Sequence, residues 1–314
     1  MEMVDIQTFR LENTTGAYAE VTNYGATLLS VVVPDKSGRL ENVVLRYKRI
    51  EDYLSDPFYT GSTVGRIANR IARAQFELNG KTYQLDKNDG KNTNHGGFTG
   101  FNSRLFDYQT NDHQVIFKYR SANGEGGFPG NLLLSVGYSF SDDNELRIEY
   151  KAVSDMETPF NPTNHAYFNF TGGRENILNH ELKIHADRYL ETDNEYIPTG
   201  KILPLSGSTF DFRDYRKLFP AINTYFISNS ETTIKHLASV REFSSGRKLD
   251  VYSSMPGIQV YTGDFLADPY RPLAGIALEA QFFPDFLNQK HFSACMLYPD
   301  AEINHCIRFR FGIL

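Results

Sequence analysis

Alternating apolar and polar residues recur along the chain in short segments rich in Val, Ile, Tyr, Phe and Thr. Turn-forming sequences separate these segments at residues 34–38, 79–80, 111–112 and 142–144. A period of two places successive side chains on opposite faces of a strand, so that one face can be buried. The pattern therefore predicts an all-β protein built from antiparallel sheets.

The clearest element is a hairpin over residues 75–85. Phe76 and Leu78 alternate with polar residues on its first strand, and the alternation continues after Asn79-Gly80. This dipeptide supplies the two positive φ angles of a type I′ turn, which matches the twist of a two-stranded hairpin.

Two further segments, 132–140 and 146–153, predict a second pair of strands joined by an acidic turn. Helical periodicity is scarce, because residues 50–54 could form only about one turn and residues 233–240 are a second short candidate. No fixed-period repeat, low-complexity stretch or Pro/Ser-rich linker divides the chain. We therefore expect a single domain over residues 1–314.

The charge balance narrows the possible partners. Lys and Arg number 32 against 38 Asp and Glu, and the net charge of -6 is spread along the sequence. We therefore expect neither nucleic acid nor an anionic membrane as a partner. Residues 1–15 have no apolar run after a basic one, and Cys295 and Cys306 belong to no metal or redox motif. These features favour a cytoplasmic protein in which both cysteines are packing residues.

Two groups that can carry a proton interrupt apolar or β-forming stretches. His165 lies within residues 161–170, and Glu279 lies within residues 275–284. A carboxylate on a buried strand is costly unless it is paired or functional. A second histidine, His95, sits in a glycine-flanked turn. One acid and one base on a rigid sheet are sufficient for proton-transfer chemistry.

Several strings of the chain resemble those of one family. They are residues 65–71, 94–97, 127–130, 161–170, 197–200, 256–262 and 278–284. Together and in this order they resemble the aldose 1-epimerases, also called galactose mutarotases, over nearly the whole length. The resemblance implies a large twisted antiparallel β-sandwich, the galactose mutarotase-like supersandwich, with a shallow sugar cleft. It also implies an isomerase that interconverts the α and β anomers of a free aldohexose such as glucose or galactose, without a cofactor or metal.

The reaction makes a simple physical demand. The sugar ring opens when a proton leaves the anomeric hydroxyl and another is donated to the ring oxygen, and it closes after rotation about the C1–C2 bond. A general acid and a general base each contribute roughly 10² to 10⁴ in rate when their pKa values suit the working pH. The resemblance implies Glu279 as the base and His165 as the acid, which we expect as a carboxylate and a protonated imidazole at neutral pH.

The resemblance also implies a set of sugar-binding residues. His95 would contact the ring oxygen or its neighbour, and Arg70 would hold a sugar hydroxyl with its planar guanidinium. Gln259 and Tyr261 either orient the ligand or simply alternate along a strand. Asn223 stands where the family commonly has aspartate, and an amide keeps one acceptor while adding two donors. This departure bears on sugar preference more than on the reaction type.

Each assignment has a structural alternative. His165 could be a satisfied histidine of an aromatic strand, and His95 could be an ordinary loop residue. Glu279 could form a buried ion pair with an arginine, and Arg70 could be part of such a salt bridge or a solvated strand residue. Four further residues are expected on the surface or in packing: Arg66, His113, His185 and His305.

Two other functions stay open at this point. An enzyme of the same fold acting on hexose 6-phosphates would line its cleft with extra cationic side chains, for which the sequence offers Arg66 beside Arg70. A non-catalytic carbohydrate-binding or sensing protein would keep the cleft, although it has no need of a charge in an apolar strand. The sequence lacks zinc-ligand spacings, a nucleophile elbow and phosphate-binding loops. It leaves the oligomeric state and the pathway open.

Overall fold

Three antiparallel sheets build most of the computed structural model, which describes residues 5–314. The strands of the four-stranded sheet are, in spatial order, β1 (Thr8–Glu12), β2 (Tyr18–Thr22), β3 (Thr27–Pro34) and β4 (Leu40–Asn42). Those of the nine-stranded sheet are β10 (Asp107–Asn111), β11 (Gln114–Ser121), β12 (Leu132–Phe140), β13 (Glu145–Ser154), β27 (Ile303–Ile313), β23 (Arg247–Ser253), β22 (Lys235–Arg241), β17 (Glu181–Ile184) and β20 (Arg216–Lys217). Those of the six-stranded sheet are β16 (Tyr167–Phe168), β25 (Ile276–Gln281), β24 (Gly257–Tyr261), β21 (Asn223–Ser228), β18 (Ala186–Thr192) and β19 (Pro198–Pro204).

Short ladders and 3-10 turns connect these sheets. The two-stranded ladders are β5 (Thr63–Val64) with β15 (Thr163–Asn164), β6 (Arg70–Ile71) with β9 (Thr93–Asn94), β7 (Gln75–Leu78) with β8 (Lys81–Gln84), and β14 (Thr158–Pro159) with β26 (Met296–Leu297). The 3-10 turns are η1 (Ile50–Ser55), η2 (Ala72–Ala74), η3 (Phe101–Ser103), η4 (Glu125–Gly127) and η5 (Ile177–Asn179).

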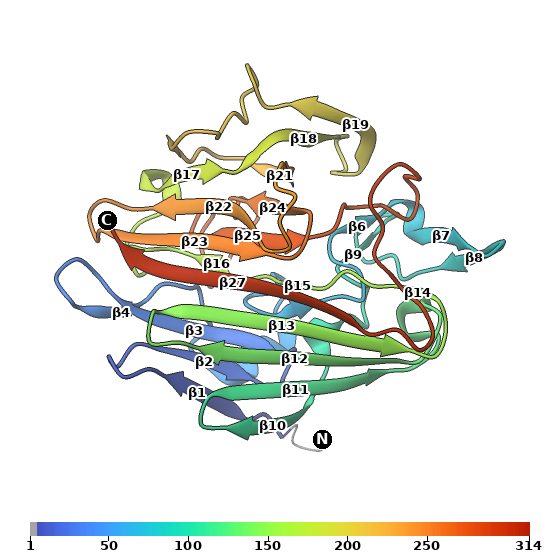
Figure 1. Ribbon diagram of the computed structural model, residues 1–314, viewed down its shortest axis with the longest axis horizontal. Helices are drawn as coiled ribbons and strands as arrows, with labels where there is room; N and C mark the ends of the chain where they lie inside the picture. Colours follow the sequence, from blue (N-terminus) through green and yellow to red (C-terminus); the bar gives the residue numbers. More distant parts are fainter. Residues whose placement is uncertain (1–4) are drawn as a thin grey trace.

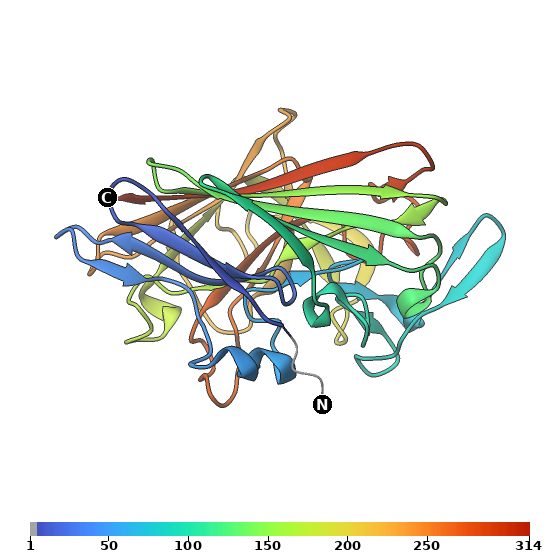
Figure 2. The same ribbon diagram turned by 90° about the horizontal axis from the view of Figure 1, so that it is seen from below.

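The nine-stranded sheet forms one broad face of the molecule, with its strands side by side from β10 to β17 (Figure 1). Figure 2 shows the four-stranded sheet on one side of the molecule and the β7–β8 hairpin projecting from the other. Buried side chains from the four-, six- and nine-stranded sheets meet in one core. The predicted twisted antiparallel β-sandwich is confirmed.

Alternation along the strands decides which side chains enter this core. Every second side chain of β13 over residues 146–152 is buried in it. On β25, Leu278 and Ala280 enter the same core, so Glu279 between them points to the opposite face of the sheet. The alternation along β25 thus places Leu278 and Ala280 in the core and Glu279 on the face that points away from it.

The structure confirms most of the predicted elements. β7 and β8 form the hairpin predicted over residues 75–85, and they pair around Asn79 and Gly80, whose φ angles are 53° and 73°. The second predicted strand pair is β12 with β13, and the predicted single helical turn is η1. Cys295 and Cys306 are buried free cysteines, as expected of packing residues.

The helix predicted at residues 233–240 is wrong. This segment contains β22, which pairs with β17 on one side and β23 on the other. Residues 237–240 are all buried, and a bulge between His236 and Ala238 interrupts the register. Because both faces of this strand are covered, it shows no alternation from which a strand could be recognised.

Two other expectations concern the chain as a whole. Within residues 5–314, no helix combines the length and the apolar character that crossing a bilayer requires. The single domain over residues 1–314 stays a prediction, and residues 1–4 lie outside the described part of the chain.

Candidate active site

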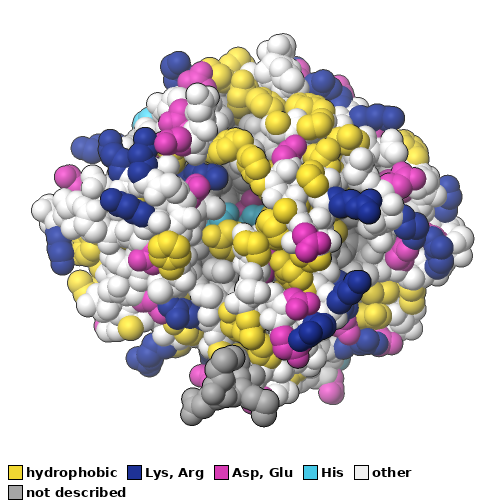
Figure 3. All heavy atoms as spheres, turned by 180° about the vertical axis from the view of Figure 1, so that it is seen from behind, with side chains coloured by type: hydrophobic (Ala, Val, Ile, Leu, Met, Phe, Trp, Pro, Cys, Tyr) yellow, Lys and Arg dark blue, Asp and Glu magenta, His cyan; other side chains and the backbone are white. Residues whose placement is uncertain are grey.

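A cleft opens on the face of the molecule that lies away from the nine-stranded sheet. Figure 3 shows this face hollowed near its centre, with histidine side chains at the bottom of the hollow. The cavity has a volume of about 160 Å³. This is below the ~300–1,000 Å³ of pockets for drug-sized ligands, so it suits one small molecule. The lining residues are Pro57, Phe58, Tyr59, Asn69, Arg70, Asn94, His95, His165, Tyr167, Asn223, Gln259, Tyr261, Phe265 and Glu279. Every site residue predicted from the sequence is among them.

Glu279 reaches the cleft from the middle of β25. The pairing of β24 with β25 places Gln259 directly opposite it, and the pairing of β21 with β24 places Asn223 opposite Tyr261. Directly opposed residues on neighbouring strands have adjacent side chains on one face. The six-stranded sheet therefore presents these four side chains together as one wall of the cleft.

His165 reaches the cleft from the short connection between β15 and β16. Its backbone N–H donates to the carbonyl of Ser62 at 2.9 Å, and its carbonyl accepts from the N–H of Gly61 at 3.0 Å. The amide of Asn164 also donates to the carbonyl of Gly61 at 2.7 Å. The backbone on both sides of the imidazole is thus fixed by hydrogen bonds.

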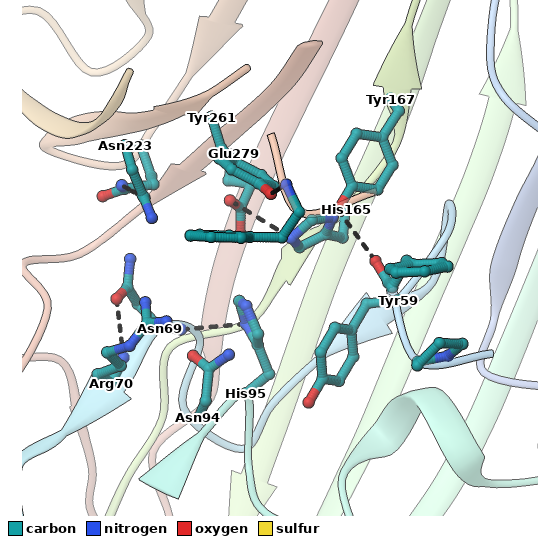
Figure 4. A pocket seen from close by; sticks show the side chains of 14 residues that line it. Tyr59, Asn69, Arg70, Asn94, His95, His165, Tyr167, Asn223, Tyr261 and Glu279 are labelled. Carbon is teal, nitrogen blue, oxygen red and sulfur yellow. Dashed lines mark hydrogen bonds and ion pairs between the residues drawn. The ribbon is translucent and has the colours of Figure 1, made fainter. Parts of the chain in front are cut away.

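His165 and Glu279 face each other across the bottom of the cleft, as Figure 4 shows. His165 Nε2 lies 3.7 Å from Glu279 Oε1, and both side chains are buried. Within residues 5–314, neither His165 Nδ1 nor Glu279 Oε2 has a hydrogen-bond partner. Buried polar atoms without a partner are unusual in folded proteins, so this pair is a candidate for interaction with a ligand.

Burial controls the protonation of this pair. It raises the pKa of Glu279 to about 8, although the positive charge of Arg70 opposes part of the effect. It lowers the pKa of His165 to about 4. At neutral pH the free cleft therefore holds a protonated carboxyl group and a neutral imidazole. The expectation of an ionised Glu279 beside a protonated His165 is wrong for the free cleft, because burial disfavours the charged form of each group and outweighs the opposing effect of Arg70 on Glu279.

His95 is held in one tautomer. Its Nδ1 accepts a hydrogen bond from the backbone N–H of Asn69 at 3.2 Å, so in the neutral ring the proton is on Nε2. Burial lowers its pKa well below the usual range, which keeps the ring neutral. The ring centre lies 5.1 Å from that of His165, and the two planes are nearly perpendicular. His95 is therefore a neutral hydrogen-bond donor.

Arg70 both lines the cleft and forms a salt bridge. Its Nε donates to Asp89 Oδ2 at 2.7 Å, so the predicted alternative of a salt bridge is present. Its guanidinium carbon also lies 5.1 Å from the ring centre of Tyr196. Because Arg70 lines the cleft as well, Asp89 and Tyr196 hold its guanidinium in place beside the ligand space.

The remaining predicted residues are linked to neighbouring side chains and backbone. Gln259 Nε2 donates to Asn223 Oδ1 at 2.6 Å, which leaves the amide nitrogen of Asn223 as a donor for a ligand. The hydroxyl of Tyr261 accepts from the backbone N–H of Phe265 at 2.7 Å. Both Gln259 and Tyr261 therefore belong to the wall of the cleft rather than merely alternating along a strand.

Arg66 does not reach the cleft. Its guanidinium is buried and donates to the side chain of Ser121 at 2.9 Å and to the carbonyls of Pro129 and Gly130 at 2.6 and 2.8 Å. It is a packing residue, as expected, and it binds the loop that contains the string 127–130. Arg70 is thus the one arginine that lines the cleft within the described part of the chain.

Sequence reasoning missed several lining residues. Asn69, Asn94 and Tyr167 lie within the strings that resemble the aldose 1-epimerases, and this position could have indicated that they line the cleft. Tyr59 packs its ring 4.7 Å from that of His95, but it sits in a loop with a φ of 57°. Neither Tyr59 nor Phe265 belongs to a recognised string, and no pattern in the sequence pointed to either.

His95, His165 and Glu279 also form a group whose ligand atoms lie within 4.8 Å of one another. A histidine that binds a metal donates the proton of its other ring nitrogen to an acceptor. His95 does the reverse, because Nδ1 accepts from Asn69 and Nε2 carries the proton. The group therefore suits a hydrogen-bonding organic ligand better than a three-residue metal site.

Comparison with protein families gives one match over nearly the whole chain. The family described as aldose 1-epimerase matches residues 7–310. Among curated proteins, a galactose mutarotase of Mus musculus is 40% identical over 311 residues, covering 94% of this chain and 91% of its own length. An aldose 1-epimerase of Escherichia coli (strain K12) is 34% identical over 324 residues, covering 96% of this chain and 94% of its own.

Solved structures agree with these sequence matches. A homologue of GalM/aldose epimerase from C. elegans superposes with a TM-score of 0.94 at 29% identity, covering 98% of this chain and 99% of its own. A galactose 1-epimerase from Lactobacillus acidophilus NCFM superposes with a TM-score of 0.86 at 29% identity, covering 100% and 96%.

Proposed function

The chain belongs to the aldose 1-epimerase family of isomerases, and from that membership we propose that it interconverts the α and β anomers of a free aldohexose such as glucose or galactose. The observation that carries the proposal is the buried pair at the bottom of the cleft, His165 Nε2 and Glu279 Oε1 at 3.7 Å. Each member of the pair retains a polar atom without a protein partner among the described residues.

The pair supplies both proton transfers of ring opening. Glu279 takes the proton of the anomeric hydroxyl, and His165 gives a proton to the ring oxygen as the bond from C1 to that oxygen breaks. Rotation about C1–C2 exposes the other face of the aldehyde. Closure then returns both protons, so the protein ends as it began. Acid and base each contribute roughly 10² to 10⁴ in rate at such a site.

Sugar binding must first move the shared proton. In the free cleft it resides on Glu279, whose pKa of about 8 exceeds that of His165, about 4. Sugar hydroxyls that donate to the carboxylate, together with the charge of Arg70, favour the ionised carboxylate. The proton then passes to His165, and the reactive carboxylate–imidazolium pair forms next to the bound sugar.

The other cleft residues hold the sugar. His95 Nε2–H donates to the ring oxygen or its neighbour, where negative charge develops. Arg70, whose Nε is taken by Asp89, offers its terminal nitrogens to hydroxyl oxygens. Asn223 and Gln259 present amide groups to a further hydroxyl, and Tyr261 closes that side of the cleft.

The two competing functions fit less well. A sugar phosphate would call for more than one cation in the cleft, but Arg66 is bound to carbonyls elsewhere. A pure binding protein gains nothing from a carboxyl group whose burial is costly. A cytoplasmic location, a small-molecule sugar as substrate and the absence of nucleic-acid and membrane partners remain part of the proposal, which leaves the oligomeric state open.

Polarimetry tests the proposal directly. Fresh α-D-glucose and α-D-galactose should mutarotate faster with the protein than without it, and Glu279→Gln should lower kcat by about 10²-fold or more while sugar affinity is retained. Glu145→Gln is a matched control, because Glu145 pairs with Arg308 on the nine-stranded sheet outside the cleft. A wild-type rate equal to the spontaneous rate would overturn the function, and full activity of Glu279→Gln would overturn the assignment of the base.

A further inference from the structure

Asn161 is fully buried where three segments of the cleft meet. Its backbone N–H donates to the carbonyl of Arg66 at 2.8 Å, and its carbonyl accepts from the N–H of Ala68 at 2.7 Å. Its side-chain Oδ1 accepts from the N–H of Phe282 at 2.8 Å, and its Nδ2 donates to the carbonyl of Phe282 at 3.3 Å. One residue thus bonds to two distant segments through four different polar groups.

Each of these segments leads directly to the site. Ala68 precedes Asn69, whose N–H fixes the tautomer of His95, and Arg70 follows. Phe282 directly follows β25, the strand that carries Glu279. Asn161 itself begins the string that contains His165. Asn161 therefore connects the three segments that carry the proposed acid, the proposed base and two of the proposed sugar-binding residues.

The Asn161 side chain supplies hydrogen bonds at the end of β25, where, in the described part of the chain, strand pairing is present on one side of β25 but not on the other. On one side, β24 pairs with it along residues 277–281. On the other side, strand pairing among the described residues covers Ala277 and Ile276 alone, through β16. Beyond that point the hydrogen bonds from this side come from side chains, because Thr163 Oγ1 donates to the carbonyl of Ala280 at 2.7 Å and Asn161 binds both backbone groups of Phe282.

We propose that Asn161 is a positioning residue, which sets the distance between Glu279 and His165 by fixing the end of β25 against the segment that carries Asn69 and Arg70. The inference rests on the proposed function. Asn161 does not line the cleft, so it acts on the reaction only through these neighbours. A displacement of about 1 Å at a reacting group can cost about 10²-fold in rate.

The test compares Asn161→Ala with a matched control. Asn13→Ala removes another buried amide that bridges two segments, from Asn13 Nδ2 to the carbonyl of Ser141 at 3.1 Å and to Asn144 Oδ1 at 2.9 Å, outside the cleft. Thermal unfolding should show a loss of stability in both variants. Polarimetry should show kcat lowered about 10- to 100-fold with KM within about twofold for Asn161→Ala, and unchanged kcat for Asn13→Ala.

Asn161→Asp keeps the shape and the acceptor for the N–H of Phe282 but loses the amide donor, and it replaces Asn161→Ala if the latter does not fold. Its kcat should fall less than that of Asn161→Ala, with KM within about twofold, because one of the two hydrogen bonds that fix the end of β25 is kept. Wild-type kcat in both Asn161 variants would overturn the inference while leaving the proposed function intact. A wild-type protein without activity would overturn both.

Discussion

The imidazole of His95 and the backbone of Asn69 are joined by a hydrogen bond of 3.2 Å in which Nδ1 is the acceptor. The bond fixes a proton on Nε2, the atom that donates to a sugar oxygen in the proposed reaction. His95→Asn should lower kcat/KM by roughly 10²-fold, as expected when one donor to a developing negative charge is removed. Asparagine tolerates the φ of 51° at this position, so the backbone should be preserved.

His95→Gln is the matched comparison, because its amide N–H can reach the place of Nε2. It should retain about tenfold more kcat/KM than His95→Asn, measured by polarimetry on the same sugar. Equal activity of the two variants would show that the donor at Nε2 contributes nothing.

The acid–base pair also predicts the pH dependence of the rate. The reaction needs one proton on the pair, which holds two protons at low pH and none at high pH. Because the pKa values of His165 and Glu279 are about 4 and about 8, kcat/KM should be highest between these values and fall on both sides. A profile measured from pH 3.5 to 9.5, after subtraction of the spontaneous rate, checks this. A rate that stays flat from pH 6 to 9.5 would be inconsistent with the burial of Glu279.

The same shifts predict a change of stability with pH. Glu279 binds a proton more tightly in the folded state, so its contribution to the free energy of unfolding is lost as the pH rises from 4.5 to about 8. His165 binds its proton less tightly when folded, so its contribution rises with pH from about 4 to 6.5. The two effects oppose each other up to pH 6.5, and above it only that of Glu279 remains.

Glu279→Gln should therefore gain stability relative to the wild type between pH 6.5 and 8, by about 2 kcal/mol. Urea unfolding of both proteins at pH 6.5 and pH 8 measures this difference, in which the titration of all other groups cancels. A difference that is the same at both pH values would show that the carboxyl group is not buried as described.

Asn223 and Gln259 predict how the cleft distinguishes sugars. In Asn223→Asp the carboxylate still accepts from Gln259, but the free amide donor is lost. Loss of one hydrogen bond of about 1 kcal/mol should change KM about fivefold for the sugar that uses this donor, with kcat within about threefold. The measurement is KM for glucose and galactose, with Asn179→Asp as an exposed control that adds the same charge. Unchanged KM for both sugars would remove Asn223 from the binding site.

Gly96 allows the turn of His95 to approach its neighbours closely. A Cβ at Gly96 would lie 1.9 Å from the carbonyl oxygen of Gly65, and the φ there is 90°. Gly80 has a φ of 73°, but within residues 5–314 no atom lies within 4 Å of such a Cβ. Gly80→Ala should cost about 1–2 kcal/mol for its left-handed backbone, and Gly96→Ala should cost clearly more because atoms clash as well. Urea unfolding compares them, and equal losses would contradict the close approach.

The sequence could predict the elements whose pattern is local. The hairpin around Asn79 and Gly80 follows from its turn residues and its alternation, and Glu279 was recognised because a charge interrupts an apolar strand. β22 could not be predicted, because cover on both faces removes the alternation on which recognition depends. Tyr59 and Phe265 enter the cleft from loops, and only the tertiary structure brings these loops to the site.

The protonation states of Glu279 and His165 also could not be predicted from the sequence. The expected charges of Glu279 and His165 assumed that their environments maintain ordinary or favourable pKa values. The degree of burial reverses that expectation, and burial depends on side chains from several sheets rather than on neighbours in the chain.

Arg66 connects residues that are far from the ligand to residues that touch it. Its guanidinium binds carbonyls of the loop at residues 121–130, and its own carbonyl binds Asn161. We therefore expect a substitution that reshapes this remote loop to change sugar binding, although none of residues 121–130 lines the cleft.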